Sequence, residues 1–227
     1  MPKTAKLYTT SVAILGLALL AACLTALWQP TDPTRFVCYL GIAIVASTFK
    51  IRLPGIRSTI SINFLLILMA ITALSLDEAL IIGCAATAVQ CYWRVPKRPM
   101  RIQVAFNLGS VSISISGAWA VRALLGQYNP AAVVLEATVF FILNTGMVSV
   151  VLSLIGGKPV LTLWRQCHLY AFLYYLIGAA IAGCASAVSR SAGWESSLLI
   201  LPVMYLVYAH YELWVAQRLT IESAARR

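Results

Sequence analysis

Six polar side chains lie inside or at the edge of long apolar runs of this chain. Five of them come within about two helical turns of a basic segment: Asn63, Gln90, Asn107, His168 and His210. The sixth, Asn144, lies near the middle of its run. Burying such groups in hydrocarbon is costly unless they find hydrogen-bond partners. We therefore expect them either to line a ligand-binding cavity or to hold neighbouring helices together.

The residue patterns typical of enzymes are missing from the sequence. It contains no His-Glu-x-x-His, Gly-x-Ser-x-Gly or Walker motif, and no pair of histidines at metal-ligand spacing. A lipid-modifying membrane enzyme would need a cluster of acids and histidines, and only His168, His210 and Glu212 are placed for one. The six cysteines contain no Cys-x-x-Cys pair and are interpreted as packing residues. We predict no enzyme activity, no cofactor and no metal.

Arg122 and Glu136 flank the short link 126–130 between two apolar runs. If these runs form a helical hairpin, the two side chains lie at similar depth on adjacent helices. Opposite charges inside a membrane protein tend to pair with one another. We predict a structural ion pair between Arg122 and Glu136 near the outer interface.

The composition indicates whether the polar side chains described above lie in water or in a lipid bilayer. The chain is 61% hydrophobic and 11% charged, with a mean hydropathy of +0.86. These values are typical of a polytopic integral membrane protein and exclude an ordinary soluble domain. The net charge of +10 is interpreted as retention of Lys and Arg on the cytoplasmic side, with attraction to anionic lipids. We expect membrane lipids as partners, and no nucleic acid.

The charges alternate along the sequence. Most Lys and Arg residues fall in every second gap between apolar runs, in the segments 3–6, 50–57, 94–101, 158–165 and 218–227. Most Asp and Glu residues fall in the other gaps. Because Lys and Arg stay in the cytoplasm during insertion, this pattern predicts that both termini are cytoplasmic.

We predict an all-α bundle of about eight transmembrane helices. The expected spans are 7–28, 35–49, 58–75, 76–93, 102–125, 131–155, 167–189 and 196–214. Ser75 and Glu78 have the spacing of a capping box at the start of the fourth span. An alternative has seven spans, with the second run re-entrant. No broken pair of helices and no inverted repeat is evident.

The expected organisation is a single transmembrane domain, 1–214, followed by a short basic cytoplasmic tail, 215–227. The tail is rich in helix-forming residues and is interpreted as a continuation of the last helix. The first apolar run is interpreted as a retained helix, since it is longer than a typical signal peptide core.

Several segments resemble a family of bacterial membrane proteins. They are 52–64, the Gln90-x-x-Trp93 stretch, 103–107, 141–145, and 164–167 with 174–183. Together they resemble the multi-spanning N-terminal sensor regions of signalling proteins whose output is an HD-GYP phosphodiesterase or a GGDEF cyclase. The resemblance covers most of residues 35–214. Neither output signature occurs here, so the resemblance implies a sensing or scaffolding role and no catalytic residue.

Two functions follow as hypotheses. The first is a non-enzymatic sensor or signalling module in the bacterial inner membrane, which passes a membrane or ligand state to the cytoplasmic side. Its output partner would be a cytoplasmic signalling protein, or a second copy bound through the last helix. The alternative is a small-solute binder or transporter, similar to the membrane-embedded substrate-binding subunits of vitamin uptake systems.

Overall fold

A computed structural model describes residues 1–25, 32–52, 59–61, 63–95, 98–126 and 129–199, with a few isolated positions beyond. Only the backbone is described at 50–52, 59–61, 130, 166–171 and 174. The predicted tail 215–227 lies outside the described residues, as does about half of the predicted eighth span.

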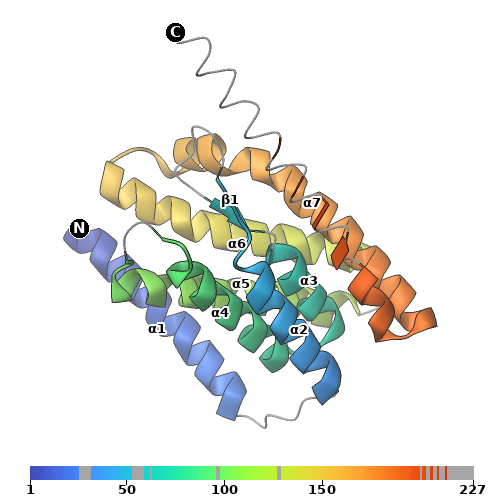
Figure 1. The fold of residues 1–227 in the computed structure, drawn as a ribbon. Helices are drawn as coiled ribbons and strands as arrows, with labels where there is room; N and C mark the ends of the chain where they lie inside the picture. The colour runs from blue at the N-terminus through green and yellow to red at the C-terminus, as the bar shows by residue number, and fades with distance from the viewer. Residues whose placement is uncertain are drawn as a thin grey trace.

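The described chain is helical apart from one small hairpin (Figure 1). Its helices are α1 (Lys3–Thr25), α2 (Pro33–Ala46), α3 (Asn63–Ala73), α4 (Leu76–Tyr92), α5 (Arg101–Leu125), α6 (Pro130–Gly156) and α7 (Val160–Ala192). A 3-10 helix, η1 (Trp194–Leu199), follows α7, and the strands are β1 (Lys50–Arg52) and β2 (Thr59–Ser61). The expectation of a helical bundle is confirmed.

Three described helices are long and apolar enough to cross a membrane. They are α1, α5 and the part of α6 from Ala131 to Gly156. Helices α2 and α3 are apolar but shorter. The structure therefore supports a membrane protein, while the count of about eight spans stays a prediction.

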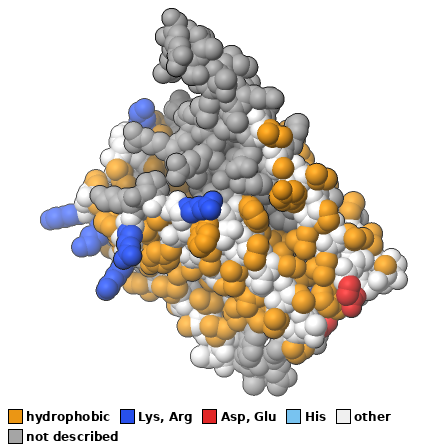
Figure 2. Space-filling view, viewed as in Figure 1, with side chains coloured by type: hydrophobic (Ala, Val, Ile, Leu, Met, Phe, Trp, Pro, Cys, Tyr) orange, Lys and Arg blue, Asp and Glu red, His pale blue; other side chains and the backbone are white. Residues whose placement is uncertain are grey.

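Charged side chains gather at opposite ends of the bundle. In Figure 2 the Lys and Arg side chains lie along one side and the acids on the opposite side, with hydrophobic surface between them. The N-termini of α1, α5 and α7 and the C-termini of α4 and α6 carry exposed Lys or Arg at or near them. We call this the basic end, and the opposite end, with Asp32, Asp77, Glu78 and Glu195, the acidic end.

The third predicted span is wrong at its beginning. Residues 58–75 were expected to form one helix, but Thr59–Ser61 form a strand and α3 begins at Asn63. The strand pairs antiparallel with Lys50–Arg52, so that Ile51 opposes Ile60. The alternation of β-branched and polar residues in Thr59-Ile60-Ser61 suits a strand better than a helix. The chain therefore contains two short helices, α2 and α3, joined through a hairpin, which the sequence reading did not detect.

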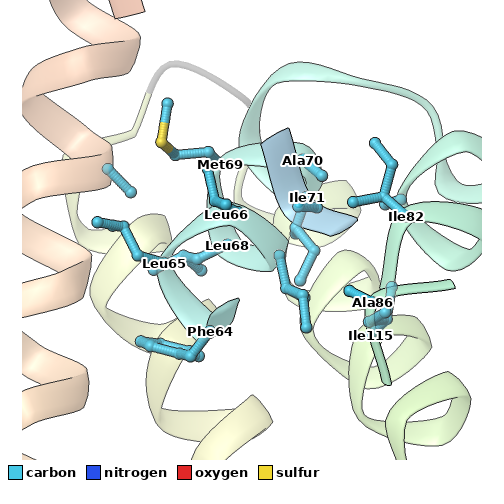
Figure 3. Packing of buried hydrophobic residues seen from close by; sticks show 14 of the residues in the cluster. Phe64, Leu65, Leu66, Leu68, Met69, Ala70, Ile71, Ile82, Ala86 and Ile115 are labelled. Atoms are coloured by element: carbon cyan, nitrogen blue, oxygen red, sulfur yellow. The ribbon is translucent and has the colours of Figure 1, made fainter. Parts of the chain in front are cut away.

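Helix α3 is the centre of the bundle. Every residue from Asn63 to Ile71 is buried. The helix packs against α2, α4, α5, α6 and α7. Figure 3 shows Ala70 and Ile71 of α3 near Ile82 and Ala86 of α4. A helix that is apolar all round belongs inside a bundle, and α3 occupies that position.

The start of α4 follows the prediction. The Ser75 side chain accepts a hydrogen bond from the Glu78 backbone N–H, and the Glu78 carboxylate accepts one from the Ser75 backbone N–H. The predicted capping box is thus confirmed. It separates α3 from α4 at the acidic end, since it satisfies N–H groups that would otherwise lack partners.

Helices α1 and α5 cross at two glycines. A Cβ atom on Gly109 would lie 2.6 Å from the Val12 carbonyl oxygen and 2.8 Å from the Ala13 Cα. A Cβ atom on Gly16 would clash with the backbone of Gly109. The two backbones approach closely because neither glycine has a side chain, as is common between helices in membranes.

The crossing gives a prediction for stability. Gly109→Ala should destabilise the fold by about 1–3 kcal/mol, because backbone cannot move aside as easily as a side chain. Gly146→Ala on α6 is the matched control, since nothing lies within 4 Å of its added Cβ atom. The control should be neutral or slightly stabilising, because Ala favours a helix. Thermal unfolding of the purified proteins measures both, and equal midpoints would contradict the close crossing.

Candidate functional site

Asn144 joins three helices near the centre of the bundle. Its Oδ1 atom accepts a hydrogen bond from Ser110 Oγ of α5 at 3.3 Å. Its side chain also forms a hydrogen bond with that of Tyr175 on α7. Asn144 is half-buried in the middle of α6, and two neighbouring helices supply hydrogen-bond partners for its side chain.

Aromatic rings surround this polar centre. The Tyr175 ring centroid lies 3.9 Å from that of Phe64 on α3 and 4.8 Å from that of Phe141 on α6. Phe64 also lies 5.5 Å from Phe140, measured between ring centroids. A Cβ atom on Gly178 would come within 2.8 Å of the Phe64 ring, so this glycine gives the ring its space. Tyr175 thus contacts both α3 and α6.

Trp164 extends the cluster toward the basic end. Its indole Nε1 donates a hydrogen bond to Thr145 Oγ1 at 2.8 Å, and Thr145 follows Asn144 directly on α6. The Trp164 and Phe141 ring centroids are 5.6 Å apart. We call Phe64, Ser110, Phe141, Asn144, Thr145, Trp164 and Tyr175 the central cluster.

Asn107 belongs to a second polar contact. Its Nδ2 donates a hydrogen bond to Cys91 Sγ of α4 at 3.3 Å. Asn107 and Ser110 are three residues apart on α5 and so share one face of this helix. Through these two residues α5 forms one polar contact with Cys91 of α4 and another with Asn144 of α6.

The remaining predicted site residues have mixed outcomes. Asn63 is buried as the first residue of α3, immediately before Phe64 of the central cluster. Gln90 is half-buried on α4 beside Cys91. His168 lies on α7 four residues after Trp164, but its side chain is not described, and His210 lies outside the described residues. One shared cavity lined by all of them stays a prediction.

The chemistry available at the central cluster is hydrogen bonding and stacking. An amide, three hydroxyls and an indole N–H can orient a polar ligand, while the aromatic rings suit a planar or apolar one. Within the described part of the chain, no three His, Cys, Asp or Glu side chains gather as metal ligands. Ser110 and Tyr175 are functional candidates that sequence reasoning missed, although the spacing of Ser110 from Asn107 on one helix face could have indicated the first.

Arg122 holds the other end of α3. Its Nη1 donates a hydrogen bond to the backbone carbonyl of Ile71. The last four carbonyl groups of a helix have no partner within the helix, and Ile71 supplies one of them in α3. A guanidinium at this position also interacts favourably with the negative end of the helix dipole. Arg122 therefore caps the C-terminus of α3 from α5.

Glu136 is 1% exposed, and its Oε2 has no hydrogen-bond partner. The carboxylate interacts electrostatically with Arg122, and Arg122 also lies within the field of Arg35. The direct partner of Arg122 is the Ile71 carbonyl, which the prediction did not include. The C-terminus of α3 thus binds the guanidinium, and the direct ion pair between Arg122 and Glu136 stays a prediction.

This geometry predicts unequal effects of removing the two charges. Arg122→Gln should destabilise the protein by about 1–3 kcal/mol, because it leaves the buried Ile71 carbonyl without its donor. Glu136→Gln should cost less than about 1 kcal/mol, because a carboxylate with an unpartnered oxygen already carries a desolvation cost. Thermal unfolding of both single variants and the double variant measures the effects. Equal losses that vanish in the double variant would instead indicate a direct ion pair.

Comparison with protein-family models, with curated proteins and with solved structures gives no match for this chain. What the molecule does must therefore be inferred from its own residues and their contacts.

Proposed function

We propose that this chain is a non-enzymatic sensor or signalling module of the bacterial inner membrane. It has about eight spans, with the basic end and both termini in the cytoplasm. The separation of basic and acidic side chains to opposite ends supports this orientation (Figure 2). The resemblance of residues 35–214 to membrane sensor regions supports the role.

The observation that carries the proposal is the position of α3. At one end of this helix, Phe64 packs on Tyr175 of the central cluster. At the other end, the Ile71 carbonyl is bound by Arg122. Between them the helix is buried against five other helices. A displacement at either end therefore cannot be absorbed locally, because packed helices shift between discrete arrangements.

The mechanism needs an input that binds two packings with different affinity. A ligand or lipid that changes the contacts of Asn144 would move Tyr175 and, through it, Phe64. Helix α3 would carry that movement to Arg122 and the capping box at Ser75. A stimulus at the acidic end would travel the opposite way, from Arg122 to the central cluster and the basic end.

Hydrogen exchange measured by mass spectrometry tests this coupling. Arg122→Gln should increase amide exchange in α3 and also in 140–145 and 172–178, where the central cluster contacts α3. Lys158→Gln is the control, since it removes a positive charge from an exposed position in the link between α6 and α7. An increase confined to the last turn of α3 would contradict transmission through the helix.

The second candidate, a small-solute binder or transporter, gains support from the interrupted helices. At 1.5 Å per residue, α2 extends about 21 Å and α3 about 16 Å, against a hydrocarbon core of about 30 Å. Non-helical backbone at membrane depth is tolerated where it is buried in protein or lines a water-filled cavity. Transporters build substrate sites from such interrupted helices.

Ligand screening followed by a flux assay separates the two candidates. Thermal shifts of the protein in nanodiscs against vitamins, nucleobases and lipids should identify a ligand that raises the unfolding temperature. Asn144→Ala should abolish that shift, because it removes hydrogen bonds to α5 and α7. Thr138→Ala should keep it, since Thr138 is half-buried on the same helix and its hydroxyl donates to the Val134 carbonyl of that helix.

The same ligand is then tested for flux into proteoliposomes. A sensor should bind without net flux, whereas uptake that depends on Asn144 would replace the sensor proposal with transport. A shift that Asn144→Ala leaves intact would place the ligand elsewhere in the bundle.

A further inference from the structure

Five exposed cations meet at the basic end around the start of α5. They come from the N-terminus of α1, from the link between α4 and α5, and from α5 itself: Lys3, Lys6, Arg94, Arg98 and Arg101. We call them the α1–α5 basic patch.

The fold brings these distant segments together. Helices α1 and α5 cross while pointing in the same direction, and the Tyr8 and Phe106 ring centroids are 6.5 Å apart. The close crossing at Gly16 and Gly109 keeps their first turns at the same end. Arg94 has a φ of 43°, a conformation unusual for a residue other than glycine. Its guanidinium lies 5.9 Å from the centre of the Trp93 ring.

The stretches of sequence that carry these five cations contain no acidic residue. Neither 1–31 nor 79–135 contains an Asp or Glu residue. The acids of the described residues lie at the acidic end or, like Glu136, near it on α6. Like charges gathered at one place repel one another, so a bound anion would stabilise the arrangement.

Exposed apolar side chains adjoin the cations directly. Leu7 follows Lys6 and is 70% exposed, Met100 precedes Arg101 and is 54% exposed, and Trp93 precedes Arg94 and is 45% exposed. The partner that fits such a surface has a negative head beside an apolar body. A free anion or a nucleic acid would leave the apolar neighbours uncovered, whereas a lipid covers both.

We propose that the α1–α5 basic patch binds the headgroup of an anionic phospholipid of the surrounding membrane. The cations contact the phosphate, and Leu7, Trp93 and Met100 lie against the glycerol and the first part of the acyl chains. Aromatic residues and cations beside them are the side chains that membrane proteins place at this depth. The inference rests on the proposed membrane location and is independent of the sensor role.

Native mass spectrometry of the purified full-length protein tests the site. Phosphatidylglycerol should bind in preference to phosphatidylcholine, and raising the salt concentration should reduce this preference. Arg98→Gln with Arg101→Gln should lower the affinity for phosphatidylglycerol at least about tenfold, since each cation near an anionic lipid contributes several-fold.

A matched control distinguishes this patch from general attraction. Lys158→Gln with Arg165→Gln removes the same charge from exposed positions at the link between α6 and α7, also at the basic end. This control should keep the lipid preference. Equal loss in both double variants would overturn a localised site, and so would an absence of preference in the unaltered protein.

Two further experiments identify the ligand and show whether each variant is folded. Glycerol phosphate should not compete with the lipid at equal concentration, and full competition would mean that the patch binds a free phosphate ester. Incorporation of each variant into phosphatidylcholine nanodiscs checks folding and membrane location. If incorporation succeeds and lipid preference is absent, the lipid site fails while the membrane location stands.

Discussion

The structure depends on how the backbone ends of α3 are satisfied without water. This helix is too short to carry its ends to both surfaces of a membrane, so its terminal polar groups lie inside the bundle. Arg122 from α5 binds the Ile71 carbonyl at one end. Asn63 begins the other end, which follows the strand β2. An unpaired carbonyl inside the bundle would cost about 1–3 kcal/mol, the magnitude of a typical destabilising mutation. The contact between Arg122 and Ile71 therefore fixes where α3 ends and how α5 lies beside it.

The same requirement accounts for the charged residues of the acidic end. Glu78 serves the N-terminus of α4 through its Oε2 atom, and Arg122 serves the C-terminus of α3. The two caps flank one tight junction between these helices, and both charged side chains form hydrogen bonds with the backbone there. Glu136 lies near this junction with an unpartnered oxygen. Its charge lowers the electrostatic cost of holding Arg122 inside the bundle. The desolvation cost of the charged groups at this junction is thus offset by these specific contacts and not by surface salt bridges.

Local sequence patterns predicted much of this fold. The features that the sequence did not predict depend on contacts between distant segments. Apolar runs and the Ser75–Glu78 spacing predicted the helices and the start of α4 because both signals lie within one helix. The strand at Thr59–Ser61 was missed because hydropathy alone does not distinguish a strand from a helix in a short apolar run. The Pro54-Gly55 pair, in the gap between the second and third predicted spans, was a turn signal that could have indicated the hairpin. Asn144 was identified by its depth, but its partners Ser110 and Tyr175 lie on other helices, so the sequence could not pair them. The partner of Arg122 is a backbone carbonyl, which no pattern of side chains reveals.

The way α3 is held also distinguishes the two proposed functions in energetic terms. Transport past the central cluster would require α3 or its neighbours to open a path, which breaks the Arg122 contact and separates Phe64 from Tyr175. Since lipid chains are as apolar as the helix itself, the packing of α3 and its polar contacts, and not the hydrophobic effect, hold it in place. Both would be lost together during opening. Sensing requires only a shift between two packings in which these contacts are retained or exchanged. A helix buried on all sides and held near both ends is well suited to the smaller movement.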